Sequence, residues 1–308
     1  MFARKSLGLE IYPDGIRLAL ISGSRTKPVV EAFDTAPLHA DTIHISLREA
    51  NILDPGKFVT TVRDTHLRLL TKTVRTSVSL PDAAGRVILL DLDTRFKSRD
   101  EAGDIIRWKL KKNFPFDIND AHFDFQQVQE RETGEIVVLV SLICRQVLVQ
   151  YEELLAQAGL EPNHIDFTTF GIYELFADRF SLDNDYGFIC YFNGVVSVLL
   201  FREGALEFYR TKELSAATFT PNRVYREISS SLLVHQDKHP GVPLGKVYCL
   251  TSYDQVEEFK VLVSEATSQE PVLLDVERVL SRSATCSTID RNALYAMSAA
   301  CGAALRNL

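Results

Sequence analysis

Short apolar runs separated by tight turns open the chain. Residues 7–11, 16–22 and 28–37 are strand-like, with turns at residues 13–15 and near Gly23. Runs of this length bounded by Gly, Pro and Asp are typical of β-strands joined by short connections. The chain therefore begins with a predicted three-stranded meander.

The same three-strand pattern returns about 180 residues later, a spacing that indicates an internal duplication. Residues 187–192, 195–201 and 205–211 are strand-like, and Asn193-Gly194 and Glu203-Gly204 separate them. Asn-Gly between two apolar runs favours a hairpin because both residues tolerate positive φ. Helices and strands alternate after each meander, so the pattern predicts two similar domains that face one another.

Helical periodicity and cap residues predict the remaining elements. Helices are expected at residues 55–69, 98–113, 148–158, 170–180, 223–236, 255–266 and 291–305, and strands at residues 74–80, 86–92, 122–129, 136–142, 165–167, 246–250 and 272–274.

These elements predict an α/β fold with an insertion. Residues 84–144 carry their own helix and hairpin, which indicates a small subdomain inserted into the first domain. The first domain is then formed by residues 1–83 and 145–184, and the second by residues 185–308, with a small helical excursion at about 215–243.

Composition narrows the function classes. The 308 residues are 46% hydrophobic, enough to bury a sizeable core. The net charge is −7, and the pI near 5.6 argues against a nucleic-acid partner, because phosphate contacts need a basic face. The five cysteines form no CxxC pair, so we expect buried free thiols in a reducing compartment.

The apolar runs are short throughout. No run reaches the roughly 18 apolar residues of a membrane-spanning helix. The first residues also lack the apolar stretch of a secretion signal. The sequence therefore predicts a cytoplasmic protein that reaches a membrane only through a partner.

Five stretches of the chain, taken in order, carry a family resemblance. They are residues 2–11, residues 105–116 with 123–125, residues 151–160 with 165–166, residues 227–232 and residues 299–306. The segment IRWKLKKNFPF is the most distinctive of them. The ordered set resembles the PilM-like type IV pilus assembly proteins, a branch of the actin-like ATPase superfamily related to FtsA.

The resemblance implies actin-like, ribonuclease H-like duplicated domains with an inserted small subdomain. It implies an ATP site in the cleft between the domains, and a groove beside the inserted subdomain for the cytoplasmic N-terminal tail of a membrane protein, PilN. The expected role is a cytoplasmic scaffold of type IV pilus assembly, peripheral to the inner membrane. A GspL-like module of type II secretion resembles the same family and stays an alternative.

An actin-type cleft needs glycine where backbone N–H groups meet phosphates, and short carboxylates that direct Mg²⁺. The family's first turn reads Asp-Ile-Gly, whereas this chain has Glu10-Ile11-Tyr12. The Asp and Gly of the second turn correspond to Cys190 and Phe192, and Thr251-Ser252-Tyr253 replaces a glycine pair.

These departures predict a degenerate cleft that needs no cofactor and does not hydrolyse ATP. The residues of the vestigial cleft are Glu10, Tyr12, Asp14, Gly15, Asn193, Gly194 and Thr251. Weak binding of ATP and Mg²⁺ is a second interpretation. A third is an active ATPase, in which Glu10 serves for Asp and Tyr12 turns away.

Aromatic and arginine side chains near the inserted helix suggest a partner surface, because such residues anchor interfaces. The candidates are Arg107, Trp108, Phe114 and Phe116. A core anchor is the alternative interpretation of Trp108. The same region has a basic bias, which indicates either a solvated helix face or a contact with anionic lipid headgroups.

His235 and His239 lie four residues apart on a predicted helix. That spacing presents two ligands to zinc on one helix face. No third ligand is evident in the sequence, and the helix end is polar. We therefore expect both side chains in solvent and no metal site.

Overall fold

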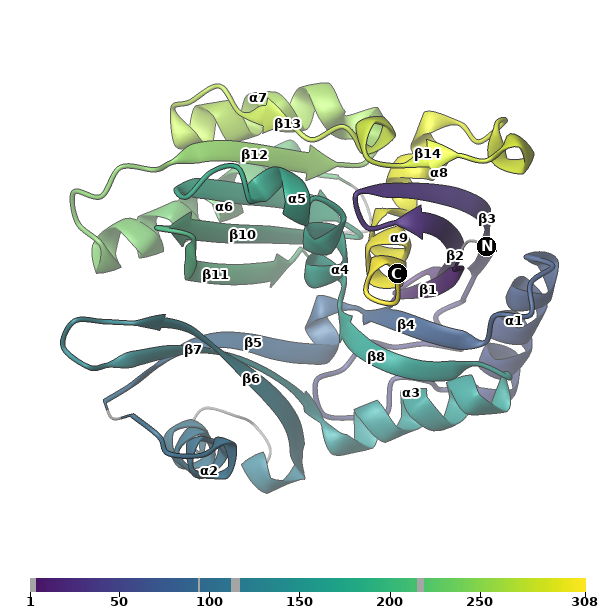
Figure 1. The fold of residues 1–308 in the computed structure, drawn as a ribbon, viewed down its shortest axis with the longest axis horizontal. Coiled ribbons are helices and arrows are strands. Elements are labelled where there is room, and N and C mark those ends of the chain that lie inside the picture. The colour runs from purple at the N-terminus through teal and green to yellow at the C-terminus, as the bar shows by residue number, and fades with distance from the viewer. Residues whose placement is uncertain (1–3, 94, 112–116, 215–218) are drawn as a thin grey trace.

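The computed structural model describes residues 4–93, 95–111, 117–214 and 219–308. Two large sheets and one small sheet, each flanked by helices, make up the described chain (Figure 1). The two predicted meanders are present, each as the start of one large sheet.

The first sheet has six strands in the order β14-β3-β2-β1-β4-β8. Its strands are β1 (Ser6–Tyr12), β2 (Gly15–Ser24), β3 (Lys27–Pro37), β4 (Arg75–Leu80), β8 (Glu161–Phe167) and β14 (Ser281–Arg282). Helices α1 (Pro55–Arg68) and α3 (Arg145–Gln157) cover one face, where Phe58, Val62 and Tyr151 are buried. Asp54 caps α1 by accepting from the N–H of Lys57, and Pro55 takes the first helical position.

The second sheet has five strands in the order β11-β10-β9-β12-β13. Its strands are β9 (Tyr186–Phe192), β10 (Val195–Arg202), β11 (Ala205–Glu213), β12 (Lys246–Thr251) and β13 (Val272–Leu273). Helices α6 (Pro221–Lys238) and α7 (Val256–Thr267) cover its outer face, where Val224, Ile228 and Phe259 are buried. The predicted helical excursion is thus part of this domain's outer layer, as far as it is described.

One shared core lies between the two sheets. It contains Ala19 and Ile21 of the first sheet together with Phe188 and Leu199 of the second. The helices within it are α4 (Thr168–Leu175), α5 (Ala177–Phe180), α8 (Arg291–Ala296) and α9 (Ser298–Leu305). The predicted helices at residues 170–180 and 291–305 are each two helices, because the backbone at residues 176 and 297 is not helical.

Helix α9 crosses back to the first sheet, although its residues fall in the range 185–308 predicted for the second domain. A Cβ added to Gly8 of β1 would lie 1.9 Å from the carbonyl oxygen of Ala300. Ser6 Oγ also donates to Ala304 O at 2.6 Å. Strand β14, which the sequence does not reveal, likewise pairs with β3. The late part of the chain completes the early domain.

The inserted subdomain is an antiparallel sheet in the order β5-β7-β6. Its elements are β5 (Gly85–Leu92), α2 (Arg99–Leu110), β6 (Ala121–Glu130) and β7 (Ile136–Cys144). Ile106 and Leu110 of α2 pack on one face, against Val138 and Val140. The opposite face turns toward β11 of the second domain (Figure 1).

The five cysteines are free and buried, as predicted. Burial raises the pKa of the Cys190, Cys249 and Cys301 thiols, so these side chains behave as small apolar groups.

Candidate functional site

Two hairpin turns face each other across the cleft between the domains. The first joins β1 to β2, where Tyr12 pairs with Gly15, and the second joins β9 to β10. Asn193 and Gly194 have φ values of 49° and 79°, the geometry that the Asn-Gly pair predicts.

Three side chains link the two turns. Arg17 Nη1 donates to Glu10 Oε2 at 2.9 Å and to Asn193 Oδ1 at 3.3 Å. Asn193 Nδ2 in turn donates to Glu10 Oε1 at 2.7 Å. Both carboxylate oxygens of Glu10, a residue that is only 1% exposed, are therefore engaged by the protein itself.

The ring of Tyr12 completes this cluster. The guanidinium of Arg17 lies 3.9 Å from its centroid, a cation–π contact. A Cβ added to Gly15 would lie 2.7 Å from the Tyr12 hydroxyl, so the ring covers this turn. Burial acts to lower the pKa of Arg17, but the attraction of Glu10 and Tyr12 outweighs it and the net shift is upward. Arg17 therefore stays charged and paired.

A cavity of about 480 Å³ remains beside this cluster, and we call it the cleft. Tyr12, Asp14, Arg17, Asn193 and Gly194 line it, together with Phe192, Gln255 and others. Of the predicted residues, Glu10, Gly15 and Thr251 do not line it. Thr251 is fully buried and donates to Tyr191 O.

The cleft departs from the actin-type site for a magnesium-bound nucleotide. Each oxygen of Glu10 accepts a hydrogen bond from within the protein, one from Asn193 and one from Arg17. The position of the second carboxylate holds Cys190, whose thiol is buried and whose pKa is raised by burial. The sequence analysis missed Arg17, although it is the one charged residue in the apolar run 16–22, opposite Glu10 in the hairpin.

Two of the four predicted partner residues, Arg107 and Trp108, lie on α2. Trp108 is 76% exposed, so its interpretation as a core anchor is wrong. Arg107 pairs with Asp104 and stacks over Phe123, which keeps it on the subdomain surface. Phe114 and Phe116 lie outside the described residues.

Three basic side chains of this region form ion pairs. Arg99, Arg107 and Lys109 pair with Asp124, Asp104 and Asp93, respectively.

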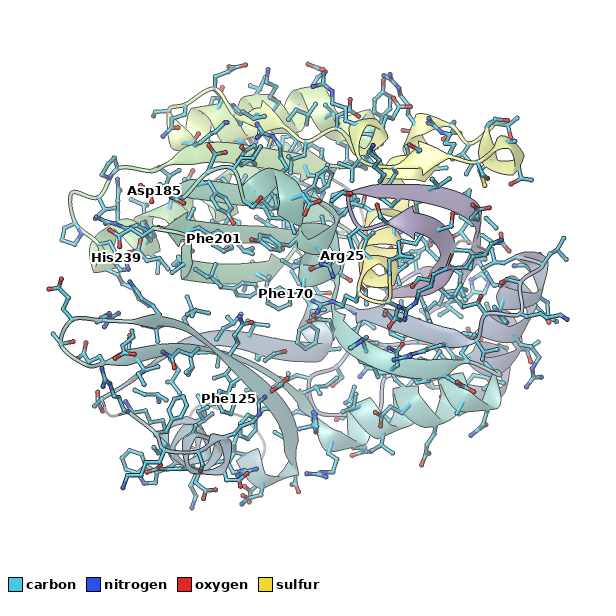
Figure 2. All side chains as sticks on the ribbon, viewed as in Figure 1. Arg25, Phe125, Phe170, Asp185, Phe201 and His239 are labelled. Atoms are coloured by element: carbon cyan, nitrogen blue, oxygen red, sulfur yellow. The ribbon has the colours of Figure 1, made fainter. Side chains whose placement is uncertain are left out.

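A groove lies on the other side of the inserted sheet, between β6, β7 and β8. Two adjoining cavities of about 230 and 310 Å³ form it, and both are lined by Asp124, Ser141, Ile165 and Asp166. We call it the β6–β8 groove. Phe170, at the junction of the inserted sheet with both domains, lines one end of it (Figure 2).

Two strand edges border this groove. β6 is an edge strand of the small sheet, and β8 is an edge strand of the first sheet, among the described strands. Such edges offer backbone groups that can pair with an added strand.

Buried acids lie in and behind the β6–β8 groove. Burial raises the pKa of Asp166, while its ion pair with Arg306 opposes the shift. Behind the groove, Asp82 accepts from the N–H of Thr169 at 3.3 Å, and Tyr209 contacts it. Burial raises the pKa of Asp82 to about 7. Tyr209 also stacks on Phe170, so this acid lies against the wall of the groove.

His235 is buried and His239 is only partly exposed, which corrects the prediction that both side chains lie in solvent. His235 is 3% exposed, and its Nε2 lies 3.0 Å from Glu207 Oε2. His239 Nδ1 lies 3.4 Å from Glu207 Oε1. Glu207, on β11, was missed because it lies 28 residues before His235 and only the fold joins them.

No protein-family model matches the chain, and no protein of curated function matches it in sequence. Solved structures do match it. The PilM of a PilM–PilN type IV pilus biogenesis complex has a TM-score of 0.77 at 17% identity, covering 98% of both chains. A Bacteroides thetaiotaomicron protein with an actin-like ATPase fold has a TM-score of 0.51 at 10% identity over 94% of this chain and 95% of that one.

The fold is actin-like. This confirms the predicted fold class, two duplicated α/β domains with an inserted subdomain. The cytoplasmic domain of EpsL, an inner-membrane component of the type II secretion system of Vibrio cholerae, is also similar. Its TM-score is 0.52 at 10% identity over 96% of this chain and 94% of that one. Within the described residues, no helix is both long and apolar enough to cross a membrane.

Proposed function

We propose that this actin-like chain is a non-catalytic cytoplasmic scaffold of type IV pilus assembly. In this role it binds the N-terminal tail of a PilN-like inner-membrane protein in the β6–β8 groove. The observation that carries the proposal is this groove, bordered by two strand edges, in a chain whose fold matches that of PilM in a PilM–PilN complex over nearly its whole length.

The groove suits an extended peptide. An added strand would gain main-chain hydrogen bonds from β6 or β8, and side-chain pockets would give specificity. Leu139 and Ile165 offer apolar surface, while Asp124 and Asp166 are each paired with an arginine. This lining favours a tail with apolar side chains at alternate positions, which face the groove when the tail is extended.

The paired turns support a non-catalytic role. ATP hydrolysis of the actin type needs carboxylates free to direct Mg²⁺, and both oxygens of Glu10 are held by Arg17 and Asn193. In this proposal, the hydrogen bonds of Asn193 with Glu10 and Arg17 replace the nucleotide as the link between the domains.

Helix α2 provides a second contact in this proposal. Trp108 presents a large exposed ring beside Arg107, and residues of these types are favoured at interfaces. Phe114 and Phe116, in the segment that follows α2, belong to the same proposed surface. Because this surface and the groove lie on opposite sides of the inserted sheet, mutations can separate their contributions.

The decisive experiment measures binding of a fluorescent synthetic peptide with the sequence of the PilN-like tail from the same genome. The Ser141→Arg variant fills the groove and should weaken binding by at least about 10-fold, as the loss of a central interface contact does. Val149→Arg, on α3 outside the groove residues, is the matched control and should bind like the unmodified protein. A tail that does not bind, or that binds Ser141→Arg as well as Val149→Arg, would contradict the proposal.

A GspL-like role in type II secretion is the second candidate, favoured by the similarity to the cytoplasmic domain of EpsL. The two roles differ in the membrane protein that supplies the partner segment. Competition between the PilN-like tail and cytoplasmic segments of type II secretion components distinguishes them.

An ATP-binding role is the remaining alternative, and the cleft of about 480 Å³ favours it. Calorimetry with ATP and Mg²⁺ tests it. Micromolar binding that disappears in Glu10→Ala would support an active ATPase and contradict the non-catalytic role.

A further inference from the structure

Helix α6 places two histidines against the edge strand of the second sheet. Its buried row consists of Val224, Ile228, Ser231 and His235, which recur at helical spacing and pack toward β10 and β11. His239 follows one turn later, where the helix has ended with φ −130° and ψ 66°. The two imidazole rings stack with centroids 4.8 Å apart.

Glu207 reaches the same point from β11. Its two oxygens lie 3.0 Å from His235 Nε2 and 3.4 Å from His239 Nδ1, and no two of the three ligand atoms are more than 4.8 Å apart. Zinc–ligand bonds of about 2.0–2.2 Å in tetrahedral geometry separate neighbouring ligand atoms by roughly 3.4 Å. The two measured carboxylate–imidazole separations agree with that value, so only the two rings need to approach each other.

We propose that Glu207, His235 and His239 bind a zinc ion, with the fourth coordination position open. Two imidazoles and one carboxylate are ligands that zinc takes in proteins. His235 and Glu207 also line a cavity of about 80 Å³, bounded by Asp185, Tyr186 and the loop at residues 242–245. This volume accommodates a water molecule as fourth ligand.

The site joins two parts of the molecule. A bound ion would fasten the end of α6 to the edge strand β11. His239 lies at the border of the second domain, on the side that faces the β6–β7 hairpin of the inserted subdomain (Figure 2). Arg131, on that hairpin's turn, is close enough to act on the charge of His239. Zinc binding would therefore stabilise the second domain where it meets the insertion.

The test titrates chelator-treated, full-length protein with zinc chloride against a chromogenic competitor. We expect one equivalent to bind, and Co²⁺ in its place to give the visible absorption of a four-coordinate site. His239→Asn and Glu207→Gln should each lower zinc affinity by at least about 10-fold, since each alters a ligand. His44→Ala removes an exposed histidine far from the site in sequence and should leave affinity unchanged.

Thermal unfolding provides a second measurement of zinc binding, one that does not depend on the chromogenic competitor. Zinc should raise the melting temperature of the unmodified protein and of His44→Ala but not of His239→Asn, because a ligand stabilises only a fold that binds it. His239 is partly exposed, so its variant should fold, and far-ultraviolet circular dichroism checks this. Binding below one equivalent, or equal affinity in the His239→Asn and Glu207→Gln variants, overturns the proposal.

Discussion

The cleft and the β6–β8 groove differ in whether their polar groups are already hydrogen-bonded within the protein. At the cleft, Glu10, Arg17 and Asn193 satisfy one another across the domain boundary. At the groove, β6 and β8 present strand edges that no other described strand covers. The two hollows are of comparable size, at about 480 Å³ for the cleft and about 230 and 310 Å³ for the two parts of the groove.

The difference shows that volume alone is a poor guide to a binding site. A polar group that is already paired inside the protein has little to offer a ligand, because binding would first break that pair. An open strand edge has its hydrogen bonds still to make. The comparison therefore favours the β6–β8 groove as the binding site in the proposed function.

The largest expected effect concerns Asp82, which lies behind the wall of the groove. Its folded pKa of about 7 lies above its ordinary value of 3.8, so the fold favours the neutral form. The stability that this preference contributes is complete below about pH 4 and is lost as the pH rises through about 7. Asp82→Asn stays neutral. Its stability relative to the unmodified protein should therefore rise by up to roughly 4 kcal/mol from pH 4 to pH 8.

Urea denaturation at both pH values measures this difference, and Asp166, which also has a raised pKa, is the same in both proteins. If the difference in stability between Asp82→Asn and the unmodified protein does not change with pH, Asp82 is solvated by water. The wall of the groove would then not exclude water from this carboxyl group.

Glu10→Gln tests the pairing at the cleft. The change leaves Arg17, whose side chain is only 15% exposed, without its counter-charge. Removing one partner of such a pair should cost about 3 kcal/mol in the free energy of unfolding. Chemical denaturation measures it.

The double variant Glu10→Gln/Arg17→Met is the control for that measurement. It should be more stable than the sum of the two single effects predicts, because it leaves no unpaired charge. Additive effects would mean that Glu10 and Arg17 act independently.

Tyr12→Gly restores the residue type that a phosphate turn needs. It should cost about 1 kcal/mol, since it removes the cation–π contact with Arg17. It should not create binding of ATP and Mg²⁺, because Glu10 stays engaged. Calorimetry checks this, and a gain of nucleotide binding would identify the ring as the main obstacle in the cleft.

Trp108→Ala should have the smallest effect on stability, below about 0.5 kcal/mol, because the side chain is exposed. The same variant in the peptide-binding assay shows whether α2 adds to the groove. A stability loss of several kcal/mol would contradict the surface position of Trp108.

The sequence predicted the architecture well where local chemistry decides it. The Asn193-Gly194 turn, the Asp54 cap of α1 and the hairpin of the inserted subdomain all appear close to their expected places. Both duplicated meanders were visible because turn residues and apolar runs are adjacent in the chain.

Contacts between distant segments were not predictable in the same way. Arg17 and Asn193 are 176 residues apart, and no periodicity relates them. His235 was expected in solvent because its neighbours 236–239 are polar, but its position in the buried row of α6 decides its burial. One interpretation of Trp108 made it a core anchor, whereas α2 buries Ile106 and Leu110 instead.

Helix α9 also bears on how the protein is made. Ser6 and Ala304 are bonded across 298 positions, so the first sheet has one bare face during almost the whole of translation. The second sheet, whose strands lie within residues 186–273, has its partners available earlier. The first domain is therefore synthesised first but completes its core last. Its exposed apolar face is where a chaperone would have most to protect during synthesis.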